Sequence, residues 1–407
     1  MGSRIRFFVT VLLLGLLPAA VRAQSELPLH KKRLSERALV VWTGDYMQTI
    51  ATVALATARG IVVIDTSLIR SDDARIRQAI EREFGRSDFR YLVNTHHHHD
   101  HTAGNQVYAD ATIIGHKNVP AGMKEELTGE GLAKLVKSLE AMFKSWEEGI
   151  RNEEPASRNY RLGREGLALI PMAISELQNG FTPTYPSILF DRSLILDMGD
   201  MAVEMYSFAG IHSASDIVVF VPEEGLVAVG DLVPDSWLPY LRKEKDWDLG
   251  VILENWARIV ESGREIKHVN MAHSDMFLTI ESFQEQYKYL KTLWNGLREM
   301  RRKGMTIEDA KKAYSIEKDF PYFKDRRRDV RGTDLHGHNI EAIWERIGAS
   351  GNSGFTDNNP HLHFVLYSRF PYHWLENSIP VTLRHAGGDL DERGGLRYGL
   401  VYEALPF

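Results

Sequence analysis

Short runs of apolar residues, separated by turn residues, dominate the first hundred positions after the N-terminal region. This pattern is typical of buried strands. Between the third and fourth runs, apolar residues recur at helical spacing over residues 72–84, and Gly85 provides a stop. The predicted strands here are residues 38–42, 49–57, 61–65 and 91–94. Strands that alternate with helices favour an α/β protein with covered sheets over an all-β one.

Residues 119–179 have a different pattern, rich in Glu, Lys, Leu and Ala, with helical periodicity around residues 132–146. We expect a helical insertion between two halves of a sheet-based fold. Such an insertion could cover a site and set the size of the substrate, or it could form a dimer surface. The pattern does not choose between these roles.

Strand-like runs return after the insertion and alternate with helical segments. The predicted strands are residues 187–196, 202–208, 216–222, 226–229 and 268–271, and the predicted helices are residues 249–261, 280–303 and 306–314. The composition then shifts after Arg346, where residues 348–354 are all Gly, Ala, Ser or Asn, as in a flexible joint. We therefore expect residues 348–407 to form a separate, strand-rich tail.

The first 23 residues have the features of a cleavable signal peptide. Arg4 and Arg6 precede an apolar run at residues 7–17, and small residues lead to a cleavage position after Ala23. The run is too short to anchor the chain, because a spanning helix needs about 20 apolar residues. We expect a periplasmic or secreted protein without stable membrane insertion, whose main domain covers residues 24–347.

Charge and cysteine content narrow the chemistry. The net charge is -6 at pH 7, and Lys and Arg are spread along the chain, so nucleic acid is not an expected partner. There are no cysteines. A metal site would therefore have to use histidine and carboxylate ligands. The oligomeric state stays open.

A cluster of histidines directly follows the predicted strand 91–94. It reads His96-His97-His98-His99-Asp100-His101. In an extended segment, His96 and His98 share a face and can point at one ion. Asp100 and His101, where the chain must turn, can face a second ion. A purification tag would lie at a terminus and would not contain Asp100.

Three further candidate ligands lie where later strands are predicted to end. They are His212, Asp231 and His273. Ligand loops in α/β folds belong at strand ends. Taken singly, each residue could equally be a capping or surface residue.

The order of these motifs resembles the metallo-β-lactamase superfamily, whose hallmark is His-x-His-x-Asp-His followed by distant His, Asp or Cys, and His. The hallmark spans residues 94–105, and the other matching segments are 63–66, 209–213 with Asp216 close behind, 229–231 and 271–274. The resemblance covers about residues 36–347. It implies an αββα sandwich with the site at the edge where the two sheets meet.

The resemblance also implies a role for each candidate. His96, His98 and His212 would hold the first zinc ion. Asp100, His101 and His273 would hold the second ion, with Asp231 bridging both. Asp65 would orient the histidine loop without binding metal. Asp100 would also act in catalysis, orienting a metal-activated hydroxide and passing its proton to the leaving group.

The implied activity is hydrolysis of an ester, thioester, lactone or amide bond in a small molecule. Flavodiiron relatives carry Glu at the position of His98, which argues against a redox enzyme. β-Lactamases of the superfamily usually carry Cys or Ser at the position of Asp231, which favours the thioesterase, lactonase and esterase branches. Nuclease branches share the ligands but fit an exported acidic chain less well.

Two alternatives to this activity stay open. The signal peptide and residues 217–224 are also typical of β-lactamase-like proteins, so β-lactam hydrolysis is the first alternative. The second is a non-catalytic metal-binding accessory protein. Among the remaining histidines, His97, His99 and His116 are interpreted as packing or surface residues, with His97 and His99 as possible residues at the lip of the site.

The tail resembles the final third of lysostaphin-like zinc endopeptidases. The matching pieces are residues 351–355, 360–364 and 379–381. The upstream half of that family, which carries a His-x-x-x-Asp ligand pair, has no counterpart in the tail. His363 would then have too few partner ligands. A second peptidase site is therefore not expected, and the tail is interpreted as a remnant, a fusion artefact or a packing appendage.

Overall fold

The computed structural model describes most of the main domain and little of either end. The described residues are 27–45, 50–232, 238–239, 241, 243, 246–273, 280–324, 334–350, 365–366, 389–390 and 396–397. The predicted signal peptide and the peptidase-like motifs of the tail lie outside these residues, so both stay predictions. The chain divides into two compact units, Met1–Leu366 and Tyr367–Phe407. In the second unit, the described residues form the antiparallel pair β14 (Asp389–Leu390) and β15 (Leu396–Arg397).

The first sheet contains seven strands within the described residues, ordered as they occur in the chain. β1 to β4 are antiparallel neighbours, and β4 to β7 are parallel neighbours. The strands are β1 (Leu29–Arg33), β2 (Ala38–Thr43), β3 (Thr52–Thr57), β4 (Gly60–Ile64), β5 (Phe89–Val93), β6 (Thr112–His116) and β7 (Ile188–Phe190). The strands predicted at 38–42, 49–57, 61–65 and 91–94 are β2 to β5, with small shifts at their ends.

The second sheet has the order β12-β11-β10-β9-β8-β13 among the described strands. They are β8 (Ser193–Asp197), β9 (Ala202–Ser207), β10 (Ile217–Val221), β11 (Leu226–Ala228), β12 (His268–Asn270) and β13 (Val365–Leu366). The single strand predicted at 187–196 was wrong. The chain leaves the first sheet after β7, turns at Asp191 and Arg192, and enters the second sheet as β8.

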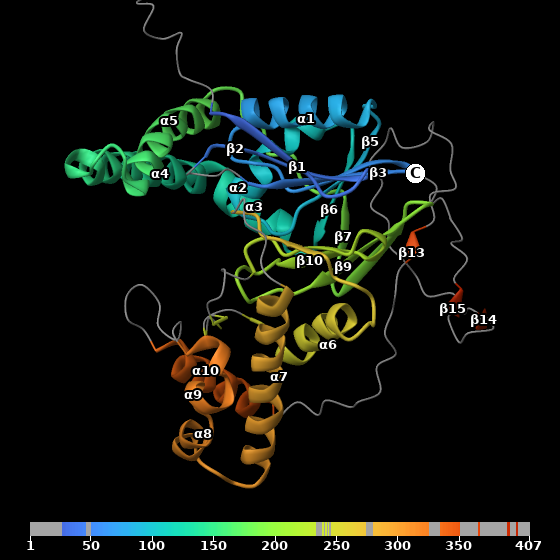
Figure 1. Cartoon of the computed structure of the whole chain (residues 1–407), viewed down its shortest axis with the longest axis vertical. Helices are drawn as coiled ribbons and strands as arrows, with labels where there is room; N and C mark the ends of the chain where they lie inside the picture. The colour runs from blue at the N-terminus through green and yellow to red at the C-terminus, as the bar shows by residue number, and fades with distance from the viewer. Residues whose placement is uncertain are drawn as a thin grey trace, which may run out of the picture. The chain divides into compact units, whose positions relative to one another are not determined.

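The two sheets pack face to face, with helices on their outer faces (Figure 1). Strand β2 shows why both faces are apolar: Val40 packs between the sheets, while Leu39 and Val41 pack under α1 (Arg70–Phe84). On the other side, α6 (Leu249–Val260) and α7 (Ile280–Arg302) cover the second sheet. The predicted αββα sandwich is confirmed.

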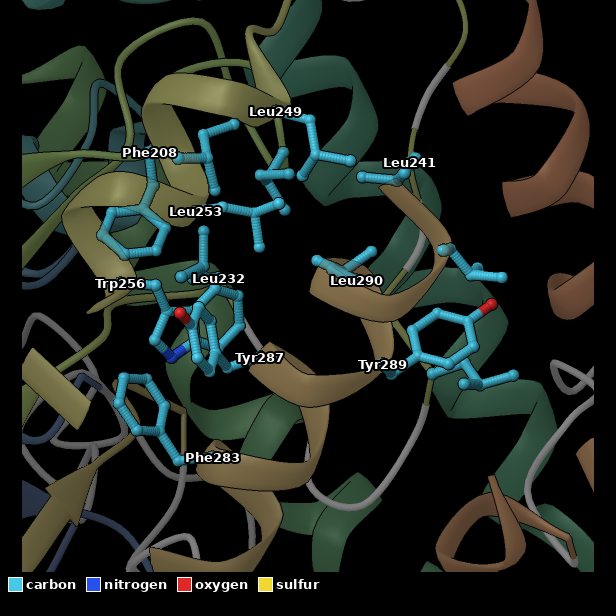
Figure 2. Packing of buried hydrophobic residues seen from close by; sticks show 14 of the residues in the cluster. Phe208, Leu232, Leu241, Leu249, Leu253, Trp256, Phe283, Tyr287, Tyr289 and Leu290 are labelled. Carbon is cyan, nitrogen blue, oxygen red and sulfur yellow. The ribbon is translucent and has the colours of Figure 1, made fainter. Parts of the chain in front are cut away.

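The cluster under α6 and α7 is rich in aromatic residues. Figure 2 shows Phe208, which directly follows β9, beside Trp256 of α6, with Phe283 and Tyr287 of α7 close by. The ring centroids of Phe208 and Trp256 lie 5.4 Å apart in an edge-on arrangement, which is favourable beyond simple burial. This packing fixes the loop that follows β9, where His212 lies.

The predicted helical insertion is present. It consists of α3 (Val119–Leu127), α4 (Gly129–Gly149) and α5 (Arg158–Gln178), and α4 and α5 share a hydrophobic cluster that includes Leu139 and Leu169.

Beyond α7 come α8 (Ile307–Ala313), α9 (Ile316–Asp319) and α10 (Leu335–Ser350). Thr306 caps α8, where its side chain accepts from the backbone nitrogen of Asp309. Helix α10 continues to Ser350, so the first three residues of the predicted joint at 348–354 are helical. Within the part of the chain that the structure describes, no helix combines the length and apolar character that crossing a membrane requires.

Candidate metal centre

The histidine loop leaves the end of β5 and turns at once into the short helix α2 (His99–Thr102). Its fold depends on hydrogen bonds to the carbonyl oxygen of His101. That oxygen accepts from the backbone nitrogen of Thr66 at 3.2 Å, from Thr66 Oγ1 at 3.0 Å and from Asn94 Nδ2 at 3.1 Å. These hydrogen bonds hold the loop against the segment after β4, and none of them uses a candidate ligand side chain.

Three imidazole nitrogens converge in the first candidate group. His98 Nδ1 lies 3.0 Å from His96 Nε2 and 3.0 Å from His212 Nε2. His212 is placed by Asp216, whose Oδ2 accepts from the backbone nitrogen of His212 at 2.8 Å. The structure therefore brings together the three residues predicted for the first ion, although His212 is 114 positions from His98 in sequence.

The second candidate group is Asp100, His101 and His273. His273 Nε2 lies 3.2 Å from Asp100 Oδ2, and His101 Nε2 lies 3.9 Å from the same oxygen. His273 follows β12 at the second sheet's end, as expected for a strand-end ligand.

Asp231 lies between the two groups. Its Oδ1 is 3.4 Å from His101 Nε2, and its Oδ2 is 3.2 Å from His273 Nε2 and 3.6 Å from His212 Nε2. Gly230, just before it, has φ of +56°, and a Cβ there would lie 2.6 Å from Thr95 Oγ1. Only glycine lets the end of β11 approach the histidine loop this closely.

Asp65 forms hydrogen bonds to the histidine loop. Its Oδ1 accepts from the backbone nitrogen of Thr95 at 2.7 Å, and its Oδ2 accepts from Thr95 Oγ1 at 2.6 Å and from His101 Nδ1 at 3.0 Å. A proton on His101 Nδ1 leaves Nε2 as the ring's lone-pair atom, facing Asp231. Asp65 adopts a positive φ of 59°, which is uncommon for a residue other than glycine.

The charges at the site favour a bound cation. Burial would raise the pKa of Asp231, but the neighbouring His101 and His273 hold it well below its usual range. Burial likewise would lower the pKa of His273, and its hydrogen bonds to Asp100 and Asp231 raise it to about 9. The buried carboxylates are thus ionised and need positive charge near them. In the metal-free protein, protonated histidines supply it.

Two buried atoms at the centre of the site, His101 Nε2 and Asp231 Oδ1, face each other at 3.4 Å as an ion pair without a well-formed hydrogen bond. A buried polar atom that lacks a well-formed hydrogen bond is costly and rare in a stable protein. Both atoms are of the kind that divalent zinc prefers when no thiolate is present. The donor set and its geometry therefore fit a metal ion.

One polar neighbour of the histidine loop was not predicted. Glu126 of α3 lies against His97, His98 and His99, and its Oε2 is 3.2 Å from the backbone nitrogen of His99. Its sequence context is that of any acidic residue on an amphipathic helix, so no local signal identified it. His97 is buried, as the packing interpretation expected, and its Nδ1 lies 2.8 Å from Ser215 Oγ.

Comparisons with known proteins give one family-model match, over part of the chain, and no match among curated proteins. Residues 49–243 match the family model described as the metallo-beta-lactamase superfamily. None of the curated proteins compared with the sequence matches it.

Several solved structures resemble the fold at low identity. A metallo-beta-lactamase from Pontibacter korlensis is 16% identical with a TM-score of 0.41, over 65% of this chain and 99% of that one. The stereoselective inverting sec-alkylsulfatase Pisa1 from Pseudomonas sp. is 14% identical with a TM-score of 0.49, over 82% of this chain and 51% of that one. The metallo-beta-lactamase FIM-1 from Pseudomonas aeruginosa, in its mono-zinc form, is 15% identical with a TM-score of 0.40, over 66% of this chain and 98% of that one.

The sequence-derived ligands also converge on one place in the fold, although they come from separate loops. Residues 49–243 thus match the metallo-beta-lactamase superfamily model, and candidate ligands from this segment converge in the structure together with His273.

Proposed function

We propose that the protein is an exported, dinuclear zinc hydrolase that cleaves an ester, thioester, lactone or amide bond of a small molecule. The observation that carries the proposal is the position of Asp231. One carboxylate lies within 3.6 Å of ring nitrogens from both candidate groups, His212 in the first and His101 and His273 in the second. A carboxylate placed in this way can bridge two ions.

The geometry supports the two ligand sets that the sequence predicts. His96, His98 and His212 would hold one ion, and Asp100, His101 and His273 the other. Divalent cations bound there would lower the pKa of a water molecule toward neutrality and stabilise negative charge on the attacked carbonyl oxygen.

Asp100 is the protein group best placed to orient the attacking water. Burial would raise the pKa of Asp100, but His101 and His273 hold it well below its usual range, so the carboxylate is ionised at neutral pH. Its Oδ2 is engaged with His273 at 3.2 Å. The ionised carboxylate can therefore accept a hydrogen bond from the attacking water and orient it.

The carboxylate at position 231 also favours one branch of the superfamily. β-Lactamases usually carry Cys or Ser at this place, whereas Asp231 is the bridging type found in esterases, thioesterases and lactonases. β-Lactam hydrolysis is the competing activity, and an idle metal-binding accessory protein is the competing role outside catalysis. Export rests on the signal-like residues 1–23.

A substrate panel separates these possibilities. The panel contains an aryl ester, an acyl-lactone, a thioester, an anilide and a chromogenic cephalosporin, each assayed with and without a chelator. We expect chelator-sensitive hydrolysis of at least one of the first four at a higher kcat/KM than the cephalosporin. Preferential turnover of the cephalosporin would support the β-lactamase, and a zinc-loaded protein that cleaves none would support the accessory role.

Variants test the bridging residue itself. Asp231→Ala should lose zinc and hydrolysis together, because it removes a ligand from both ions. Asp72→Asn is a matched control, since Asp72 is also buried but contacts Thr43 and Arg75 instead of the site. Hydrolysis that persists in Asp231→Ala with one zinc fewer would refute the bridging role.

A further inference from the structure

Helix α3 of the insertion packs directly on the histidine loop. A Cβ atom at Gly122 would lie 2.2 Å from His97 Cδ2 and 2.3 Å from His97 Cγ. The ring of His97 therefore occupies the space that a side chain at this position would need. Residues four apart lie on one face of a helix, so Glu126, one turn further on, faces the same loop.

The adjacent face of α3 is anchored in the protein. Val119, Met123 and Leu127 are fully buried and form a small cluster with Leu135 of α4 and Phe181. Their spacing places them along one apolar stripe of the helix. The position of Glu126 is thus set by the packing of α3 against both this cluster and the histidine loop.

Glu126 meets the loop with both carboxylate oxygens. Its Oε2 accepts from the backbone nitrogen of His99, the first residue of α2, and lies 3.3 Å from His99 Nδ1. Its Oε1 lies 3.8 Å from His98 Nε2 and 3.8 Å from His97 Nε2. This carboxylate also stabilises the N-terminus of α2, where backbone N–H groups are otherwise unpaired.

The side of the ring that Glu126 faces has a chemical consequence for His98. The Nδ1 atom of His98 is the one that converges with His96 and His212. A neutral imidazole that binds metal through Nδ1 must carry its proton on Nε2, and Nε2 is the atom that faces Glu126. A carboxylate on that side favours this tautomer and increases the basicity of the ligand nitrogen.

We propose that Glu126 is a positioning residue for the metal centre, which holds His98 in its metal-binding tautomer and fixes the start of α2. The inference rests on the proposed metal-dependent function and deepens it. It also gives the first helix of the insertion a direct role, because α3 supports the ligand loop through Gly122 and Glu126.

The test measures zinc binding in the full-length protein without any substrate. Zinc affinity is determined by competition with a chromogenic chelator for the wild type, Glu126→Ala, Glu126→Gln and Glu125→Ala. Glu125 is exposed, lies on the same helix and carries the same charge, so its substitution controls for net charge and helix propensity. We expect Glu126→Ala to bind the more weakly held zinc roughly 10- to 100-fold less tightly. Glu126→Gln keeps an acceptor oxygen, so its zinc affinity should lie between those of Glu126→Ala and the wild type. The zinc affinity of Glu125→Ala should match that of the wild type.

Two further readouts distinguish positioning from a general loss of structure. The absorption spectrum of the cobalt-substituted protein should change in Glu126→Ala, because the orientation of His98 changes, while the thermal unfolding midpoint of the metal-free form stays close to that of the wild type. Gly122→Ala should weaken zinc binding in the same direction, since it displaces α3 from His97.

Contrary results are equally specific. Wild-type zinc affinity and an unchanged cobalt spectrum in folded Glu126→Ala would overturn the inference. A wild-type chain with three zinc ions, falling to two in Glu126→Ala, would also overturn it, because Glu126 would then be a ligand. A wild type that binds two zinc ions and hydrolyses nothing refutes the hydrolase proposal, while the effect of Glu126 on zinc affinity still stands or fails separately.

Discussion

Replacing Asp65 with asparagine tests whether the support of the loop determines metal affinity. Asparagine matches aspartate in shape and, like it, tolerates the positive φ of this position. The backbone should therefore stay in place. The amide can still accept from the backbone nitrogen of Thr95, but its NH2 group then faces two donors, Thr95 Oγ1 and His101 Nδ1.

The magnitude follows from the lost interaction with His101. The hydroxyl of Thr95 is both a donor and an acceptor, so it can rotate and accept a hydrogen bond from the new NH2 group, which relieves its conflict. The imidazole of His101 has no such choice if Nε2 is to bind metal. A hydrogen bond to a charged group contributes about 1.5–3 kcal/mol. This range corresponds to a roughly 10- to 100-fold loss of zinc affinity, as is typical when a metal ligand loses its supporting carboxylate.

Zinc competition with a chromogenic chelator measures the effect, and Asp72→Asn is the control at a second buried aspartate. We expect Asp65→Asn to retain a cooperative unfolding transition and to lose zinc affinity, while Asp72→Asn keeps the affinity of the wild type. Equal zinc affinity in Asp65→Asn and the wild type would refute the argument that His101 depends on this carboxylate.

Three further predictions concern the strand ends, pH and metal removal. Gly230→Ala should destabilise the fold by about 1–3 kcal/mol and weaken zinc binding, because its Cβ collides with Thr95; urea unfolding and chelator competition measure both, and unchanged values would contradict the close approach. Burial lowers the pKa of His116 from 6.5 to about 4. The neutral ring's contribution to the free energy of unfolding should therefore be fully present above pH 6.5 and should be lost as the pH falls toward 4. His116→Gln should remove up to about 3 kcal/mol of that decline in urea titrations, and an unchanged acid limb would show that His116 is not responsible. Removing zinc should lower the thermal midpoint, since a ligand at about 100 times its Kd adds about 2.7 kcal/mol; identical midpoints with and without chelator would contradict a built metal site.

Much of the sandwich could be predicted because its strands are buried on both faces. Residues 38–42 and 61–65 are almost entirely apolar, which leaves few alternatives to a covered sheet. The break between β7 and β8 was missed for a related reason. Apolar residues continue on both sides of Asp191 and Arg192, and a change of sheet leaves little mark on a hydrophobic pattern.

In the candidate site, the residues close together in sequence could be predicted from their spacing, whereas the distant ones could not. His96, His98, Asp100 and His101 lie within six positions, so their spacing alone indicated a metal loop. The distant candidates His212, Asp231 and His273 were identified through the order of family motifs. Glu126 belongs to no such motif. Its relation to the loop depends on how α3 packs, and periodicity predicts that helix without specifying which side chain meets the histidines.

The most direct test of the two-ion centre is anomalous diffraction at the zinc edge from crystals of the zinc-loaded protein. The account predicts two peaks roughly 3.5–4 Å apart, one against His96, His98 and His212 and one against Asp100, His101 and His273, with Asp231 contacting both. A single peak, or peaks away from Asp231, would contradict it.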